Sequence, residues 1–415
     1  MRKSVGIALF DQAILSLFNL GLNLAMIRFA FPAEFGRFIF AAAVVLVLTS
    51  LQNALVSTPL SVLIPGRASA EQEATTSAIV SADLVFRLAA AMVAPLLCLL
   101  TSTSPAFLIA TACATFTTLG RETARSLVLA HERTIDCLRI DAVAIATTIV
   151  AIAGLWWVCS PAVASLAGIA IGNAVGIATQ SSAKPKTRMP AKTALRIYRA
   201  EFWPDTQWSL IGAGTTELQY RSYVFALELF RDAAQLAAVQ AGRLLLGPLP
   251  LVVGAWGRVA RPAMARNLAA GDSAGMIRLT TQGMIYVLSV AACYCAALYV
   301  IWPFASEKFF QGRYPEVGLM TVAWAGYMVV VVAHMVLSVP LQAAMRLKEL
   351  AQVTMVTALV TCLLLLGLTT TVPSIYAVFS LAAAEVISLA WILVLVVRLA
   401  RTSNPALSQP PVPVA

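Results

Sequence analysis

The sequence is short of charged residues. Only 12% of its 415 residues are Asp, Glu, Lys or Arg, whereas about 25% is usual in globular domains. Hydrophobic residues make up 60%, and the mean hydropathy is +0.84. Apolar runs of about 20 residues recur from end to end, and each is long enough to cross a bilayer core of about 30 Å. The composition therefore predicts an all-α integral membrane protein.

Patterns that would indicate an enzyme or a bound metal are also missing. The two histidines, His131 and His334, are far apart, and the seven cysteines form no CxxC or Cys/His ligand pattern. No GxxxxGK[ST] motif is present, which excludes a built-in ATPase of that type. No loop carries an acidic metal-binding run. We therefore predict no catalytic residues, no metal site and no cofactor.

The net charge of +10 does not indicate a nucleic-acid partner, because Lys and Arg collect in alternate loops. With the N-terminus inside, the outer loops keep only Arg37, Arg231, Lys308 and Arg313. Cytoplasmic loops of membrane proteins carry the excess of Lys and Arg. The pattern predicts an even number of spans and both termini in the cytoplasm.

The hydropathy pattern predicts about twelve spans in two six-helix lobes. They lie near 8–28, 38–63, 77–101, 105–129, 141–159, 161–180, 204–229, 234–256, 279–303, 316–338, 351–372 and 375–398. The predicted domains are an N-terminal lobe (1–180), a basic cytoplasmic linker (181–203), a C-terminal lobe (204–398) and a cytoplasmic tail (399–415). The linker ends in a short amphipathic helix, which is typical of a segment at a lipid surface. Gly and Pro near 242–250 predict a bent or broken eighth span.

Several predicted spans contain charged residues. A charge at the centre of a span costs roughly 2.5–3.5 kcal/mol on insertion scales and marks a polar cavity or a substrate path by default. Asp83 and Arg87 lie four residues apart, as do Glu217 and Arg221, so each pair shares one helix face. Each pair can neutralise itself and brace the helices, or it can line a cavity. The carboxylates can also carry a coupling ion.

Other charges have no acidic partner nearby on their own helix. Arg243 is one, and Arg28 is another, although it lies near the outer end of its span, where it can reach the interface. The planar fork of an unpaired Arg suits a phosphate, so both are candidate anion contacts. Glu385 lies mid-span and is a candidate ion-coupling carboxylate or a helix–helix hydrogen-bond partner. Asp11 lies near the inner end of the first span, where it can face water.

Two segments resemble a known family. The opening FDQAILSLFNLGLNLAMIRFAFPAEFGRF and the later FFQGRYPEVGLM are similar to segments of Wzx-like polysaccharide-biosynthesis flippases, which belong to the multidrug/oligosaccharidyl-lipid/polysaccharide (MOP) exporter superfamily. The resemblance implies a protein of the bacterial inner membrane that flips undecaprenyl-pyrophosphate-linked oligosaccharide by alternating access. It also implies a cationic cavity, whose matching positions here are Arg28, Arg87, Arg221 and Arg243.

The expected partners are the lipid-linked oligosaccharide, membrane lipids, and a polysaccharide polymerase with its co-assembly proteins. Predicted ion-coupling residues are Glu217, Asp83 and Glu385. Two alternatives stay open. One is an ion-coupled drug or amphiphile antiporter of the same superfamily, in which a carboxylate dominates. The other is a non-transporting subunit of a polysaccharide assembly complex, in which the internal charges are fully paired.

Overall fold

The computed structural model describes residues 2–63, 69–100, 104–131, 133–179, 189–314, 316–369 and 371–402. Every regular element within these ranges is helical. Arg67, three basic residues of the predicted linker (Lys184, Lys186 and Arg188) and most of the predicted tail lie outside the described residues.

The helices follow the predicted spans closely. Their bounds are α1 (Arg2–Phe29), α2 (Pro32–Gln52), the π-helical η1 (Asn53–Ser57), α3 (Thr58–Leu63), α4 (Ser69–Cys98), α5 (Pro105–Ala130), α6 (Thr134–Leu155), α7 (Pro161–Ala178), α8 (Ala191–Glu201), α9 (Trp203–Phe230), α10 (Ala233–Leu244), α11 (Leu249–Ala269), α12 (Ser273–Ala305), the π-helical η2 (Ser306–Phe310), α13 (Val317–Ala343), α14 (Leu347–Leu368) and α15 (Tyr376–Thr402). Among the described residues, nine helical segments are long and apolar enough to cross a membrane, and α10 with α11 forms a tenth, bent candidate. This confirms an all-α protein with many apolar helices.

Proline sets the start of several spans. Pro32, Pro105 and Pro161 each occupy the first turn of a helix, after an extended residue. Proline is favoured there because its missing N–H would have no partner in the first turn and its φ angle is already helical. The predicted break in the eighth span is confirmed, since α10 and α11 meet at an angle of 49°.

The chain forms two compact units, Met1–Glu217 with Asp232–Ala237, and Leu218–Arg231 with Ala238–Ala415. Boundaries between the units therefore fall within α9 and within α10, and each unit is described separately. The predicted lobe boundaries at 180 and 204 stay a prediction. A lobe is a group of helices that moves as one rigid body, and contacts within one structure do not define such a group.

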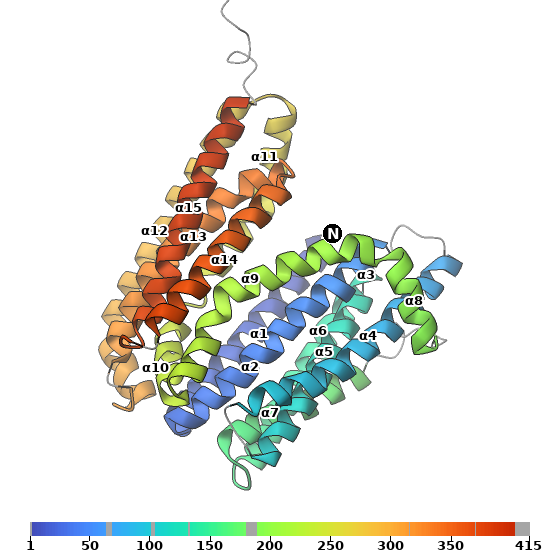
Figure 1. Ribbon diagram of the computed structural model, residues 1–415, viewed down its shortest axis with the longest axis vertical. Helices are drawn as coiled ribbons and strands as arrows, with labels where there is room; N and C mark the ends of the chain where they lie inside the picture. The colour runs from blue at the N-terminus through green and yellow to red at the C-terminus, as the bar shows by residue number, and fades with distance from the viewer. Residues whose placement is uncertain are drawn as a thin grey trace, which may run out of the picture. The chain divides into compact units, whose positions relative to one another are not determined.

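Small residues hold the first unit together. Gly168, Gly172 and Gly176 lie four residues apart on α7, and a Cβ atom on any of them would overlap atoms of α6. At Gly172 that atom would strike the Thr148 side chain and the Ala144 carbonyl. Helices in membranes approach closely where small residues repeat at this spacing. In the same unit α5 packs against α4 and α7 (Figure 1).

Helix α13 is central to the second unit, where it packs against α11, α12, α14 and α15 (Figure 1). Its buried residues include Trp324, which is fully enclosed. Gly242 brings α10 against α13, since a Cβ atom there would overlap Met320. An apolar cluster that includes Met264, Met276 and Ile392 fills the end of this unit.

Candidate functional site

Asp83 is the centre of a buried polar network in the first unit. Its side chain accepts hydrogen bonds from Gln52 Nε2 at 2.7 Å and from Thr123 Oγ1 at 2.7 Å. Arg87 Nε lies 3.1 Å from Asp83 Oδ2, which confirms the predicted i,i+4 pair. Gln52 and Asp83 are 0% and 1% exposed, so these two side chains are shielded from bulk solvent. It joins α2, α4 and α5, and both carboxylate oxygens of Asp83 have partners.

The guanidinium of Arg87 is held by its surroundings on α5. It lies over the Phe116 ring at 5.1 Å, within the range of a cation–π contact. A Cβ atom on Gly120 would overlap Arg87 Nη1, so the glycine leaves room for this side chain. Arg87 is thus a positioned, paired cation. Its predicted role as a substrate contact stays a prediction.

A second charged network in the same unit involves α1, α5 and α6. Arg125 lies 3.1 Å from Asp11 Oδ2, 3.0 Å from Asp141 Oδ2 and 3.3 Å from Glu122 Oε1. Arg121 lies 3.7 Å from Asp141 and 3.4 Å from Glu122. The sequence placed Asp11 where it could face water, but the residue is only 4% exposed. The reason is that α5 and α6 supply the partners that cover it.

The same network contains the described group with three potential metal ligands. One carboxylate oxygen each of Asp11 and Asp141, together with Cys137 Sγ, all lie within 4.8 Å of one another. Arg125 forms ion pairs with both carboxylates, so their negative charge is already compensated by a permanent cation. The arrangement fits an ion-pair network better than a metal site.

Glu385 lies in a third network, within the second unit. It accepts a hydrogen bond from Gln219 Nε2 at 2.8 Å and makes a short contact with His334 Nδ1. Thr357 Oγ1 donates to Gln219 Oε1 at 3.2 Å. Glu385 is 1% exposed. Residues of four helices, α9, α13, α14 and α15, therefore form this network.

Arg243 lies close to that network, at the end of α10. Its Nη1 donates to the Tyr223 hydroxyl at 2.9 Å, and that hydroxyl donates to Gln240 at 2.5 Å. The guanidinium lies over the Trp324 ring at 5.2 Å and over Tyr223 at 5.8 Å. The aromatic rings fix one side of the cation, and the side chain is only partly buried.

Two tyrosines connect Arg243 to Glu385. Tyr220 and Tyr327 each interact electrostatically with both Glu385 and Arg243. The sequence did not single out either tyrosine or His334 as part of a polar site. Tyr220 follows the predicted residue Glu217 by three positions on α9, and this helical spacing was the sequence feature that could have identified it.

The remaining predicted residues have different surroundings. Nη1 of Arg28 is buried and has no hydrogen-bond partner among the described residues, and the guanidinium lies 5.9 Å from the Phe29 ring centre. Glu217 accepts a hydrogen bond from Ser50 at 2.6 Å. The pairing of Glu217 with Arg221 stays a prediction, because the two residues fall on opposite sides of the unit boundary.

The fold of the chain is similar to that of several solved membrane proteins, and the likeness extends over nearly the whole chain. The chain is similar to the lipid II flippase MurJ in an inward closed conformation. The TM-score is 0.74, the sequence identity is 12%, and the match covers 97% of this chain and 91% of the MurJ chain.

A second similar structure is an inward-facing multidrug resistance MATE transporter of the MOP superfamily, with a TM-score of 0.70, 12% identity and coverage of 94% and 96%. A third is a MOP superfamily transporter from Pyrococcus furiosus, with a TM-score of 0.51, 12% identity and coverage of 95% and 93%. No protein-family model and no curated protein matches the sequence. The chain is a multi-pass membrane protein with the fold that these three structures share.

Proposed function

We propose that the chain is a MOP-superfamily flippase that moves a lipid-linked oligosaccharide, with an undecaprenyl-pyrophosphate anchor, across the bacterial inner membrane. The observation that carries the proposal is the second unit's network, in which a cation and a carboxylate–imidazole pair share two tyrosine neighbours. Arg243 is the cation, and Glu385 with His334 is the pair. The fold of a lipid II flippase supports the same substrate class.

Arg243 is suited to the pyrophosphate. Its guanidinium is oriented by the Trp324 and Tyr223 rings, and such a fork can donate two parallel hydrogen bonds to phosphate oxygens. Arg28 is a second candidate, because its Nη1 has a hydrogen to donate and no acceptor among the described residues. Arg87 and Arg221 complete the proposed cationic set. Arg87 is already paired with Asp83, so it would contribute positive charge to the site rather than hydrogen-bond donors.

The proposed cycle is alternating access coupled to a proton or another cation. Glu385 and His334 would hold the coupling proton. The nearby Arg243 would bind the anionic head group, so that its contacts differ between the substrate-bound and the substrate-free protein. Asp83 and Glu217 are secondary candidates for the coupling group. A polysaccharide polymerase and co-assembly proteins are the partners expected to use the flipped product. Both termini are expected in the cytoplasm.

Transfer of a labelled lipid-linked oligosaccharide across proteoliposome membranes tests the proposal. The wild type should transfer it, and Arg243→Gln should lower the rate at least tenfold while the protein still folds and reconstitutes. Arg258→Gln is the matched control, because Arg258 is exposed and lies in the same unit. Equal rates for Arg243→Gln and the wild type would remove Arg243 from its proposed role.

An amphiphile antiporter is the second candidate, favoured by the fold likeness to a MATE transporter and by the buried Glu385. It predicts saturable binding of organic cations that Glu385→Gln abolishes and Arg243→Gln leaves intact. The flippase proposal predicts the reverse dependence for the lipid substrate. The scaffold alternative expects fully paired internal charges, whereas Nη1 of Arg28 has no hydrogen-bond partner among the residues that the structure describes.

A further inference from the structure

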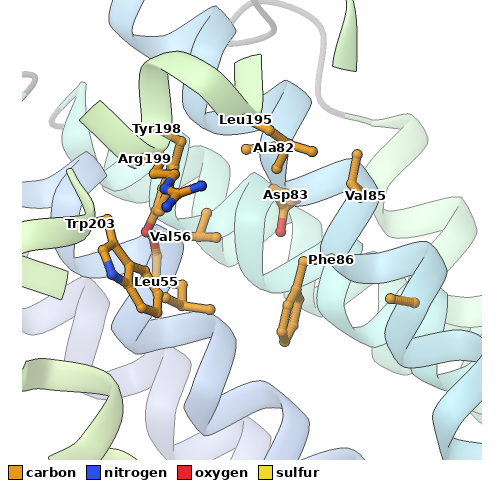
Figure 2. Close-up of a pocket in the computed structure, with 11 residues that line it drawn as sticks. Leu55, Val56, Ala82, Asp83, Val85, Phe86, Leu195, Tyr198, Arg199 and Trp203 are labelled. Atoms are coloured by element: carbon orange, nitrogen blue, oxygen red, sulfur yellow. Dashed lines mark hydrogen bonds between the residues drawn. The ribbon is translucent and has the colours of Figure 1, made fainter. Parts of the chain in front are cut away.

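A cavity of about 590 Å³ lies in the first unit, beneath the amphipathic helix α8. Figure 2 shows α8 residues Leu195, Tyr198 and Arg199 around it, with Val85 and Phe86 of α4 on the other side. Leu55 and Val56 of η1 and Trp203 of α9 complete most of the wall. Its volume is in the usual range for sites that take a small organic ligand, about 300–1,000 Å³.

The α8 wall of this cavity is fixed to the rest of the unit. The Tyr198 hydroxyl donates to the Leu55 carbonyl at 2.5 Å, in the π-helical segment η1. The Met189 backbone N–H donates to Ser81 Oγ at 3.2 Å and anchors the approach to α8 on α4. Burial raises the pKa of the Tyr198 phenol, so this group remains a hydrogen-bond donor. The cavity is therefore a feature of the folded unit rather than a gap beside a loose helix.

The lining is apolar except at its two ends. Asp83 lies at one end, but both of its oxygens are already bonded to Gln52, Thr123 and Arg87, so it does not require a ligand. At the other end Arg199 is exposed and has no ion-pair partner among the described residues. The cavity thus offers apolar contact inside and one positive charge at the rim.

The outer face of α8 adds positive charge beside that rim. Lys192, Arg196 and Arg199 recur at helical spacing and are all exposed, while Ala194 and Phe202 are buried against the unit. A helix with this division of faces lies in the plane of a membrane surface, and clustered basic residues attract anionic headgroups. Trp203 at the end of α8 is of the type that favours the same interfacial depth.

We propose that this cavity binds one anionic membrane phospholipid, with an acyl chain between α4 and α8 and the phosphate on Arg199. The apolar lining excludes a soluble anion as the occupant, and the rim charge selects an acidic headgroup over a neutral one. The cavity shares no lining residue with the proposed substrate contacts at Arg243 and Glu385. Its bound lipid holds α8 in place next to the start of α9.

Photolabelling of the full-length protein in phosphatidylcholine nanodiscs tests this site. The probe is a phosphatidylglycerol that carries a diazirine in its acyl chain. Cross-links should map to residues 82–89 and 195–203. Arg199→Gln should lower this labelling about fivefold, the amount expected for one basic residue near an anionic headgroup. Ala89→Trp, which fills the cavity from an exposed position on α4, should abolish it.

The matched control is Arg196→Gln, which removes an equal charge from α8 at a position that does not line the cavity. It should retain most of the labelling, and circular dichroism should show unchanged helicity in all three variants. The proposal is overturned if the labels fall elsewhere, if Ala89→Trp leaves them unchanged, or if Arg196→Gln removes as much as Arg199→Gln. Equal labelling by a phosphatidylcholine probe would also overturn it. So would displacement of the probe by equimolar lipid-linked oligosaccharide, since the cavity would then belong to the substrate.

Discussion

Replacement of Arg125 by glutamine should destabilise the first unit strongly. With Arg125 present, the three carboxylates of Asp11, Glu122 and Asp141 face two guanidiniums, and without it they face only Arg121. The side chains of Arg125, Asp11 and Asp141 are 12%, 6% and 1% exposed, so water screens the uncompensated charge poorly. Removal of one partner from a buried ion pair costs roughly 3–5 kcal/mol. We expect a loss in this range in the free energy of unfolding.

The measurement is equilibrium unfolding in mixed micelles with increasing fractions of SDS. Arg139→Gln is the control, because Arg139 is an exposed arginine on α6 and its replacement should change stability by no more than about 0.5 kcal/mol. Asp141→Asn added to Arg125→Gln should recover part of the loss, since one unpaired carboxylate disappears. A coupling of roughly 0.5–3 kcal/mol between the two sites is expected. If Arg125→Gln destabilises no more than Arg139→Gln, the network carries no net interaction and the reasoning fails.

Three further predictions concern packing, coupling and a loop. Gly172→Ala should destabilise the first unit by roughly 1–3 kcal/mol in the same assay, because its methyl group would overlap α6. Its control is Gly154→Ala, which places a methyl group in open space and should be neutral or stabilising by roughly 0.5–1 kcal/mol. Glu385→Gln should remove any pH dependence of the proposed oligosaccharide flipping in proteoliposomes, because the pair with His334 is lost, and an unchanged pH profile would exclude this pair from coupling. Burial raises the pKa of Tyr314 to about 12, so the folded state keeps a proton that the unfolded state loses from about pH 10, and stability should fall as pH rises through that interval. Tyr314→Phe should abolish this alkaline loss in thermal unfolding, at no cost at neutral pH, since the buried hydroxyl has no hydrogen-bond partner among the described residues.

Features that depend on residues close together in the sequence could be predicted from the sequence. The spans follow from continuous apolar runs, and the break between α10 and α11 follows from closely spaced Gly and Pro. The ion pair of Asp83 with Arg87 follows from helical spacing alone. The amphipathic helix α8 was also predicted, because its faces can be read from an 11-residue segment.

Features that depend on which helices are neighbours could not be predicted. The contact of Gln52 with Asp83 joins residues 31 apart in sequence, and that of Arg125 with Asp11 joins residues 114 apart. Asp141 was placed at the first residue of its predicted span, near the membrane surface. Helix α6 begins at Thr134, so Asp141 lies about two turns inside the helix, where α5 can reach it.

The surroundings of the predicted coupling carboxylates separate them. Asp83 is paired with Arg87, a permanent cation, so protonation of Asp83 would leave an uncompensated buried charge. Glu385 is paired with His334, an imidazole rather than a guanidinium. The partner of Glu385 is therefore not a permanent cation. Glu217 accepts a hydrogen bond from the Ser50 hydroxyl. On these grounds any pH dependence of the proposed flipping should respond to Glu385→Gln, whereas Asp83→Asn should act mainly on stability.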